Sequence, residues 1–369
     1  MSERPTSGVS APVSAALCIS EDALDRWGRV LRHLVVGLVD QAVPLRLLSS
    51  DPRVAALKLG PVQAVSHPPM DWPLASRRVA RLADALSGQP PTVFHAISGE
   101  SYLTASQLAE RLDADFVAHV SSWEECDRLG DTGVRPPSRV LASGEALAAA
   151  LEKRQIANSA TVRVCRPGAL ASEKAACFQT PGRVATMLCT SPFERDSGVE
   201  DLIEAAALLR PRGHDFLLFL LGRGSREDVF RKIVRARRLS SVVTFARPAG
   251  DVEATMTSAD LYVRPAAEAA LPFDSLHAMG AGLAVVACPN PICEHFRDGE
   301  TATLAAGSAP DHLAAAIESL IADRDKARRL ANGGLEHIRR QHTVSGMAEC
   351  VATTYRELAL SHATFTIRE

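Results

Sequence analysis

Short apolar runs rich in β-branched residues alternate with helix-forming stretches along the whole chain, and this alternation limits the possible folds more than any other feature. It is typical of a parallel sheet with helices packed on both faces. Because the runs lack a strict apolar–polar alternation, their strands are expected to be covered on both sides. The candidate strands are residues 15–20, 44–50, 92–97, 115–120, 138–143, 161–167, 183–190, 216–222, 242–246, 261–265 and 283–288.

The stretches between these runs carry the 3.6-residue apolar stripe of amphipathic helices. A chain of 369 residues exceeds the usual size of one domain, so two domains with separate cores are expected. Pro181 and Gly182 precede a new strand and mark the best linker, which puts the boundary near residue 180. We predict Rossmann-like domains at 1–180 and 181–345, with a last helix in 346–369 that crosses back to the first domain. The predicted helices are residues 21–41, 101–112, 198–211, 226–239, 309–341 and 345–362.

Composition and charge disfavour nucleic acid and a membrane span. Hydrophobic residues make up 46% and charged residues 23%, and 41 basic against 43 acidic side chains give a formal net charge of -2. Such a chain has no general attraction for nucleic acid. It contains no run of about 18 apolar residues that could span a membrane and no signal peptide, so we expect a cytoplasmic protein. The basic stretches "FRKIVRARRL" and "DRDKARRL" leave peripheral contact with a membrane open.

The cysteines do not indicate a metal site. No pair has the two-residue spacing of a zinc knuckle or of a thioredoxin motif, so reduced and mostly buried thiols are expected. Cys288 and Cys293 flank "PNPI" and could form a redox pair, although nearness alone is weak support. The eight cysteines are Cys18, Cys126, Cys165, Cys177, Cys189, Cys288, Cys293 and Cys350.

Three segments of the second half follow candidate strands directly. They are "LGRGSRED" (221–228), "RPAAEAALPFDSLHAMGAG" (264–282) and "CPNPICEHFRDGE" (288–300). An open parallel sheet binds its ligand beyond the carboxyl ends of its strands, where helix N-termini offer N–H groups to phosphate. The glycine pair in the first segment is weak support by itself, because tight turns use glycine for steric reasons.

Taken in order, these segments resemble the C-terminal half of family-4-type glycosyltransferases with the GT-B fold, over most of residues 184–345. The first half is a fainter match, through "WGRVLRHLVVGLVDQAVPLRLLSS" and "VRVCRPGAL". The resemblance implies two Rossmann-like domains that face a central cleft. It also implies transfer of a sugar from a nucleoside diphosphate to a hydroxyl of a glycan, a lipid-linked or a small-molecule acceptor, with retention at the anomeric carbon. No cofactor and no metal ion are expected.

The positions where the family binds the diphosphate carry unusual residues here. Its Gly-Arg pair falls on Ser191 and Pro192, and its Lys falls on Ser197, next to Gly198. Cations beside the leaving phosphates stabilise the charge that develops in the transition state. Arg195, in the same loop, could substitute for one lost cation.

The family's two carboxylate positions are altered as well. The first falls on Ala269, with Glu268 one residue earlier, and the second falls on His277. Asp274 lies three positions before His277, so one helical face could present both. A histidine cannot supply the fixed negative charge of a carboxylate near pH 7.

In the first half, the resemblance points to a histidine that faces the donor sugar, at His119 or, with a shifted alignment, at Ser121. A strand-end histidine bonded to backbone is an alternative for His119 and for His95. Gly28 is either a close backbone approach to the ligand or a packing glycine. The resemblance thus predicts catalytic roles for His119, Glu268 and His277. It predicts donor contacts for Gly28, Arg195, Gly198, Gly222, Arg223, Asp274, Ala278, Met279 and Glu294.

Two functions remain open at this point. The first is a retaining glycosyltransferase whose donor site uses relocated charged groups. The second is a catalytically inactive GT-B protein that acts as a binding or regulatory partner, because Pro192, Ser197, Ala269 and His277 all replace expected charged residues. The fold alone does not decide between them.

Overall fold

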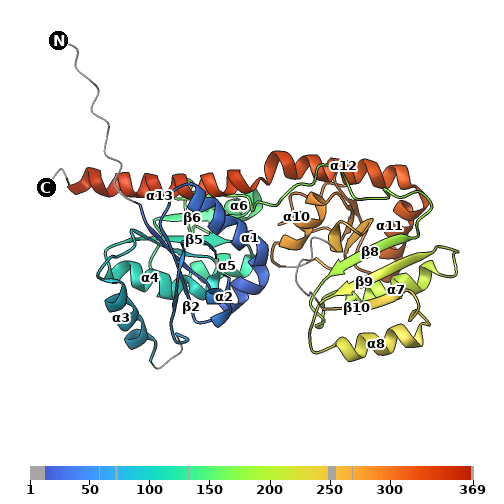
Figure 1. Ribbon diagram of the computed structural model, residues 1–369, viewed down its shortest axis with the longest axis horizontal. Helices are drawn as coiled ribbons and strands as arrows, with labels where there is room; N and C mark the ends of the chain where they lie inside the picture. The colour runs from blue at the N-terminus through green and yellow to red at the C-terminus, as the bar shows by residue number, and fades with distance from the viewer. Residues whose placement is uncertain are drawn as a thin grey trace, which may run out of the picture. The chain divides into compact units, whose positions relative to one another are not determined.

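The computed structural model describes residues 13–57, 59–70, 74–131, 133–247, 255–267 and 269–366. Its contacts divide the chain into two compact units. Unit 1 comprises Met1–Pro167 and Val344–Glu369, and unit 2 comprises Gly168–Thr343. In the described residues, each unit contains one sheet of parallel strands with helices around it (Figure 1). The prediction of an α/β protein with two parallel-sheet domains is confirmed.

Unit 1 has a seven-stranded sheet in the order β3-β2-β1-β4-β5-β6-β7. The interior strand β1 is buried at every position and pairs in parallel with β2 on one side and β4 on the other. Burial on both faces explains why the strand reads as a continuous apolar run. The strands are β1 (Ala15–Cys18), β2 (Leu45–Ser49), β3 (Gln63–Ser66), β4 (Val93–Ala96), β5 (Asp115–Val120), β6 (Arg139–Ala142) and β7 (Val162–Val164).

The helices of unit 1 include the C-terminal one. Helix α13 packs along α1, where a Cβ on Gly37 would lie 2.6 Å from the Cβ of Ala348 (Figure 1). The helices are α1 (Glu21–Asp40), α2 (Pro52–Ala56), α3 (Ala75–Leu86), α4 (Tyr102–Arg111), α5 (Trp123–Leu129), α6 (Glu145–Lys153) and α13 (Val344–Thr366), with a 3-10 turn at Gly99–Ser101 before α4.

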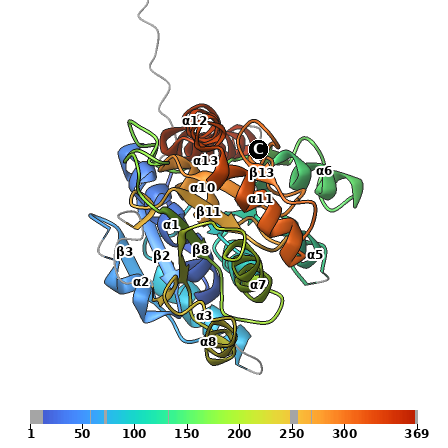
Figure 2. The ribbon, with the colours of Figure 1, turned by 90° about the vertical axis from the view of Figure 1, so that its right-hand side faces the viewer.

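Unit 2 has a six-stranded sheet in the order β10-β9-β8-β11-β12-β13. Helices α7 and α11 pack against each other, as Figure 2 shows. The strands are β8 (Ala185–Thr190), β9 (Phe216–Leu221), β10 (Val243–Ala246), β11 (Leu261–Arg264), β12 (Ala284–Ala287) and β13 (Thr303–Leu304). The helices are α7 (Val199–Leu209), α8 (Glu227–Ala236), α10 (Phe273–Gly280), α11 (Pro310–Ala322) and α12 (Arg324–Gln341).

Side-chain caps set several helix ends. The Ser20 hydroxyl accepts from the Ala23 N–H at the start of α1, and Asp323 accepts from the Lys326 N–H at the start of α12. An N-cap side chain satisfies one of the free N–H groups of the first turn. The single helix predicted over 309–341 is therefore two helices, because Asp323 ends α11 and caps α12.

The division between the units lies at Pro167–Gly168, before the boundary predicted near residue 180. The cause is a set of backbone hydrogen bonds that hold the following segment to unit 2. Ser172, Ala176 and Cys177 donate their N–H groups to the carbonyls of residues 280, 281 and 282, at 2.8, 3.1 and 3.0 Å. Within the described residues, no helix is long and apolar enough to cross a membrane.

Candidate functional site

Each sheet has one point where the strand order reverses. It lies between β1 and β4 in unit 1 and between β8 and β11 in unit 2. Open α/β sheets bind ligands outside the carboxyl ends of the strands at such points. The residues that follow these four strands are therefore the candidate site residues of each unit.

A buried arginine occupies the reversal point of unit 2. Arg264 ends β11 and is 6% exposed. Its Nη1 donates to the Thr190 carbonyl at 2.6 Å and to the Ser191 Oγ at 3.3 Å, at the end of β8. The resemblance expects a phosphate-binding Gly-Arg pair at Ser191 and Pro192. Arg264 therefore supplies a positive charge beside the position where the predicted cation is missing.

Tyr262 and Asp274 lie at the same edge. The Tyr262 hydroxyl is 2.7 Å from the Thr190 Oγ1. Burial raises the pKa of Tyr262, with the Asp274 carboxylate adding to this rise and the Arg264 guanidinium opposing it. Both charged groups thus act on one buried hydroxyl. A cation and a carboxylate at the carboxyl end of this sheet can interact with a polar, charged ligand, whereas the Tyr262 hydroxyl is enclosed in the interior.

Helix α10 presents the predicted Asp274 and His277 differently. Asp274 is exposed in the first turn, whereas His277, one turn later, is only 5% exposed. Of these two side chains, the Asp274 carboxylate is exposed and the His277 ring is buried within unit 2. Glu268, the other predicted catalytic residue of this segment, lies outside the described residues.

The predicted cations of the neighbouring loops are at the surface. Arg195 and Arg223 are exposed, and Glu294 is half-buried. Arg195 lines a hollow of about 310 Å³ together with Glu194, Asp196, Glu200, Asp201, Glu204 and Arg226. Burial, followed by the carboxylates of Glu200 and Glu204, raises the pKa of Asp201. This excess of negative charge makes the hollow a poor site for a diphosphate.

Two predicted glycines are required by the packing of the chain. A Cβ on Gly222 would lie 2.2 Å from the Ser191 carbonyl oxygen, and one on Gly198 would lie 2.8 Å from the Pro265 carbonyl carbon. Gly198 also has a φ of 72°, a left-handed conformation that favours glycine. The close approach at each of these positions is to protein backbone.

Two predicted donor contacts have no exposed side chain. Ala278 and Met279 are both 0% exposed. The Ala278 carbonyl accepts from the Leu283 N–H and the Met279 carbonyl from the Gly282 N–H, so these oxygens are used within the fold. These side chains form part of the interior of unit 2, so a donor contact at either residue, which stays a prediction, would be made by the backbone.

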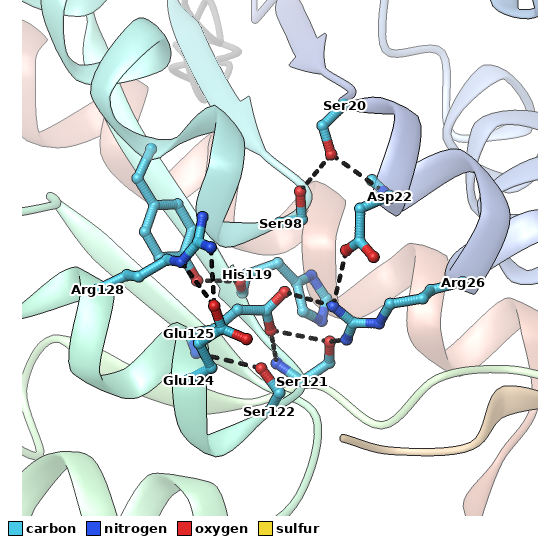
Figure 3. Close-up of polar contacts among 12 residues, drawn as sticks. Ser20, Asp22, Arg26, Ser98, His119, Ser121, Ser122, Glu124, Glu125 and Arg128 are labelled. Carbon is cyan, nitrogen blue, oxygen red and sulfur yellow. Dashed lines mark hydrogen bonds and ion pairs between the residues drawn. The ribbon is translucent and has the colours of Figure 1, made fainter. Parts of the chain in front are cut away.

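Unit 1 carries a dense polar network at its own reversal point (Figure 3). The hydroxyls of Ser20, after β1, and Ser98, after β4, lie 2.8 Å apart. Glu125, 3% exposed, accepts from the N–H and hydroxyl of Ser121 at 2.6 and 2.9 Å and from Arg26 Nη1 at 3.1 Å. Arg26 Nη2 also donates to the Ser121 Oγ at 2.7 Å. The network joins the start of α1 to the end of β5 and to α5.

The charges in this network stabilise one another. Burial lowers the pKa of Arg26, but the carboxylates of Glu125 and Asp22 outweigh it, so the pKa is raised overall. Asp22 accepts from Arg26 Nη1 at 3.0 Å and is far more exposed than Glu125. Arg26 is therefore neutralised from both sides and is a weak candidate for binding an anion.

His119 lies beneath this network in the interior. Its ring is 0% exposed and contacts Trp27 edge-to-face at 4.5 Å and His95 in a stacked arrangement at 5.6 Å. Neither ring nitrogen has a hydrogen-bond partner in the described part of the chain. Ser121, the alternative position at the strand end, is also 0% exposed, so burial does not favour one of the two positions over the other.

Gly28 lies inside α1, as the predicted helix 21–41 implies. Its φ of 38° and ψ of −100° kink the helix, and no described atom lies within 4 Å of a Cβ placed on it. The predicted role as a backbone approach to the ligand remains a proposal, now with open space beside it and a conformation that favours glycine.

Sequence reasoning missed Arg264, Arg26 and Glu125. An arginine inside an otherwise apolar strand run was the available signal for Arg264, since arginine is almost never fully buried without partners. For Arg26 and Glu125 there was none, because their contact depends on the folding of distant segments. Among the described residues, no cluster of histidine, cysteine and carboxylate side chains could hold a metal ion.

Comparisons with known proteins show which family the second half of the chain resembles. Residues 176–337, which contain β8 to β13 and nearly all of α12, match the family described as Glycosyl transferases group 1. These residues resemble a group 1 glycosyltransferase domain. Part of the chain is 25% identical over 153 residues to the uncharacterized glycosyltransferase YqgM of Bacillus subtilis, covering 41% of this chain and 43% of YqgM.

A second relative and a solved structure extend the comparison. The lipopolysaccharide core biosynthesis glycosyltransferase LpsE of Rhizobium meliloti is 27% identical over 185 residues, or 50% of this chain and 52% of LpsE. The matches thus span about half the length of these curated relatives. The structure of Anabaena Alr3699/HepE in complex with UDP and glucose is similar at a TM-score of 0.75 and 16% identity, covering 94% of this chain and 100% of that one. The chain therefore has the GT-B fold.

Proposed function

We propose that the protein is a retaining glycosyltransferase that moves a sugar from a nucleoside diphosphate to an acceptor hydroxyl. The observation that carries the proposal is Arg264, a buried cation at the reversal point of the domain that resembles group 1 glycosyltransferases. In the reaction, the bond from the anomeric carbon to the phosphate oxygen breaks and a bond to the acceptor oxygen forms. The acceptor proton passes to the departing diphosphate.

Arg264 would stabilise the diphosphate as its negative charge develops. It is held by Thr190 and Ser191, so its charge is already in place before the reaction. Preorganised charges of this kind contribute more to catalysis than mobile ones. Arg223 would assist from the surface, whereas Arg195 lines the acidic hollow, which disfavours a diphosphate. No metal ion or other cofactor would be needed.

Glu268, Asp274 and His277 would contact the sugar and the ribose of the donor. Asp274 is exposed in the first turn of α10, where a carboxylate can accept hydrogen bonds from sugar hydroxyls. Gly28 would line the ligand-binding edge of unit 1, where a Cβ placed on it meets open space. Suitable acceptors would be glycans, lipid-linked sugars or small molecules, reached by a cytoplasmic protein with or without peripheral contact to a membrane.

Calorimetric titration with UDP, GDP and ADP, followed by their sugar conjugates, tests the proposal. We expect the wild type to bind one nucleotide with a micromolar dissociation constant. Arg264→Met is expected to weaken this binding about tenfold or more, because a hydrogen bond to a charged group contributes about 1.5–3 kcal/mol. Arg195→Ala should have a smaller effect, since an exposed charge is screened by water.

Arg264→Lys and Arg210→Ala are the controls. The lysine keeps the positive charge and should restore part of the nucleotide affinity. Arg210 is paired with Asp215 at the end of α7, so Arg210→Ala should leave the nucleotide affinity unchanged. A thermal unfolding curve of each variant separates lost binding from lost folding. Binding that is unchanged in a folded Arg264→Met variant would contradict the role of this cation.

The alternative is a catalytically inactive GT-B protein that serves as a binding or regulatory partner. The acidic hollow around Arg195 favours it, together with the uncharged Pro192, Ser197 and Ala269 at positions where the family has charged residues. Absence of nucleotide binding across the whole panel would support this alternative. Sugar transfer that is lost in His277→Ala would rule it out.

A further inference from the structure

Two cysteines from distant parts of the chain face each other in unit 1. Cys165 follows β7 and is 1% exposed, and Cys350 lies in α13 and is half-buried. The Cys165 thiol donates to the Met347 carbonyl at 3.9 Å, and the Cys350 thiol donates to the Val164 carbonyl at 3.7 Å. Each sulfur therefore contacts the backbone of the other's segment, and the two thiols lie close enough to shift each other's pKa.

The two thiols have different electrostatic environments. The interaction with Cys165 lowers the pKa of Cys350 against the effect of its burial; Arg163 lowers it further and Glu357 opposes this. The same interaction, together with burial, raises the pKa of Cys165. A thiolate, not a thiol, is the reactive form. Cys350 is thus the more accessible and more reactive member, and Cys165 is the protected neutral partner.

Other cysteines of the protein lack this arrangement. Burial raises the pKa of Cys126 and Cys177 to about 12 and that of Cys288 to about 11. Cys288 and Cys293, which the sequence offered as a redox pair, are 3% and 2% exposed, and the Cys288 thiol donates to the Pro265 carbonyl at 3.0 Å. The accessible thiol of the protein is at Cys350.

We propose that Cys350 and Cys165 are a redox-sensitive pair that a peroxide oxidises to a disulfide. The Cys350 thiolate attacks one oxygen of the peroxide, and hydroxide leaves and takes up a proton to become water. The resulting sulfenic acid is then attacked by the Cys165 sulfur, which forms the S–S bond and releases a second water. Two thiols and one hydrogen peroxide thus give one disulfide and two waters, a sequence typical of a reactive cysteine beside a resolving one.

A disulfide between Cys165 and Cys350 would join the two segments of unit 1 that flank unit 2 in the sequence. The chain leaves unit 1 after Pro167 and returns to it at Val344. Cys165 stands just before the first connection and Cys350 just after the second, so the bond closes all of unit 2 into one covalent loop. It also fixes α13 to the end of β7. A cross-link over a long loop restricts the unfolded chain and stabilises the fold.

Peptide mapping of the native, full-length protein tests the pair. The protein is treated with hydrogen peroxide, free thiols are blocked with N-ethylmaleimide, and trypsin digestion is followed by mass spectrometry without reduction. We expect a linked species that joins residues 164–174 to residues 341–356 and that disappears with dithiothreitol. We also expect heating to unfold the oxidised protein about 5 °C higher than the reduced protein.

Variants distinguish the roles of the two cysteines. In Cys165→Ser the sulfenic acid at Cys350 has no partner, so dimedone should label it, whereas the wild type should form the disulfide instead. Cys126→Ser is the matched control for a buried thiol and should leave the linked peptide unchanged. The inference fails if the native protein gives no linked peptide, if the link forms only in urea, or if Cys165→Ser shows no dimedone adduct at position 350. None of these readouts depends on nucleotide binding or sugar transfer.

Discussion

Replacement of Arg26 by alanine is expected to lower the free energy of unfolding of unit 1 by about 3 kcal/mol. The substitution removes the charged partner of Glu125, whose side chain is only 4% exposed, and leaves a buried carboxylate with the Ser121 donors alone. It also removes the link between α1 and the end of β5. Loss of one partner of a buried ion pair costs more than the pair gains, because the remaining charge stays away from water.

Trp27 and Trp123 lie in α1 and α5 of unit 1, so their fluorescence during urea unfolding reports on this unit. Asp22→Ala is the matched control, because Asp22 is the other carboxylate partner of Arg26 and its side chain is 42% exposed. This substitution should lower the free energy of unfolding by less than about 1 kcal/mol. The double variant Arg26→Ala/Glu125→Leu should lose less free energy of unfolding than the sum of the losses measured for Arg26→Ala and Glu125→Leu separately. Equal effects of Arg26→Ala and Asp22→Ala would contradict the assignment.

The fold could be predicted from the sequence because strands buried on both faces leave continuous apolar runs. Each candidate run overlaps an observed strand. Two strands were missed: β3, which is largely exposed at the sheet edge, and β13, which has two residues. Short or exposed strands carry little hydrophobic signal. The helix boundary at Asp323 was missed because a single capping residue interrupts an otherwise continuous apolar stripe.

The candidate site was only partly predictable. The order of motifs located the reversal point of unit 2 and the loops with Arg195, Arg223 and Asp274, which the structure leaves exposed. It did not reveal that Gly222 is required by the Ser191 carbonyl or that Met279 is fully buried, because both follow from packing between distant segments. Aligned position alone cannot separate a ligand contact from a core residue.

Acidification is expected to destabilise unit 1 strongly, because two buried histidines in its core are held neutral. Burial lowers the pKa of His95 to about 3. Burial, with a further contribution from His95, lowers the pKa of His119 well below its usual value. The unfolded chain takes up these protons at an ordinary pKa of about 6.5. The contribution of these neutral histidines to the free energy of unfolding is therefore fully present above that pH. It decreases progressively below that pH, until the pKa values of the folded state are reached.

A histidine held neutral costs about 1.4 kcal/mol per pH unit below about 6.5, so His95 alone should lower the free energy of unfolding by about 3 kcal/mol between pH 7.5 and 4.5, and His119 should add to this loss. Urea unfolding followed by tryptophan fluorescence at several pH values measures this slope. His119→Phe removes one titrating ring, whose nitrogens have no partner in the described residues. The free energy of unfolding should then fall less steeply with decreasing pH, by the amount that corresponds to one proton fewer taken up on unfolding. His312→Gln, exposed in α11, is the control and should leave the slope unchanged. If His119→Phe kept the wild-type slope, the histidine would have to be charged in the folded state, which its enclosure between Trp27 and His95 argues against.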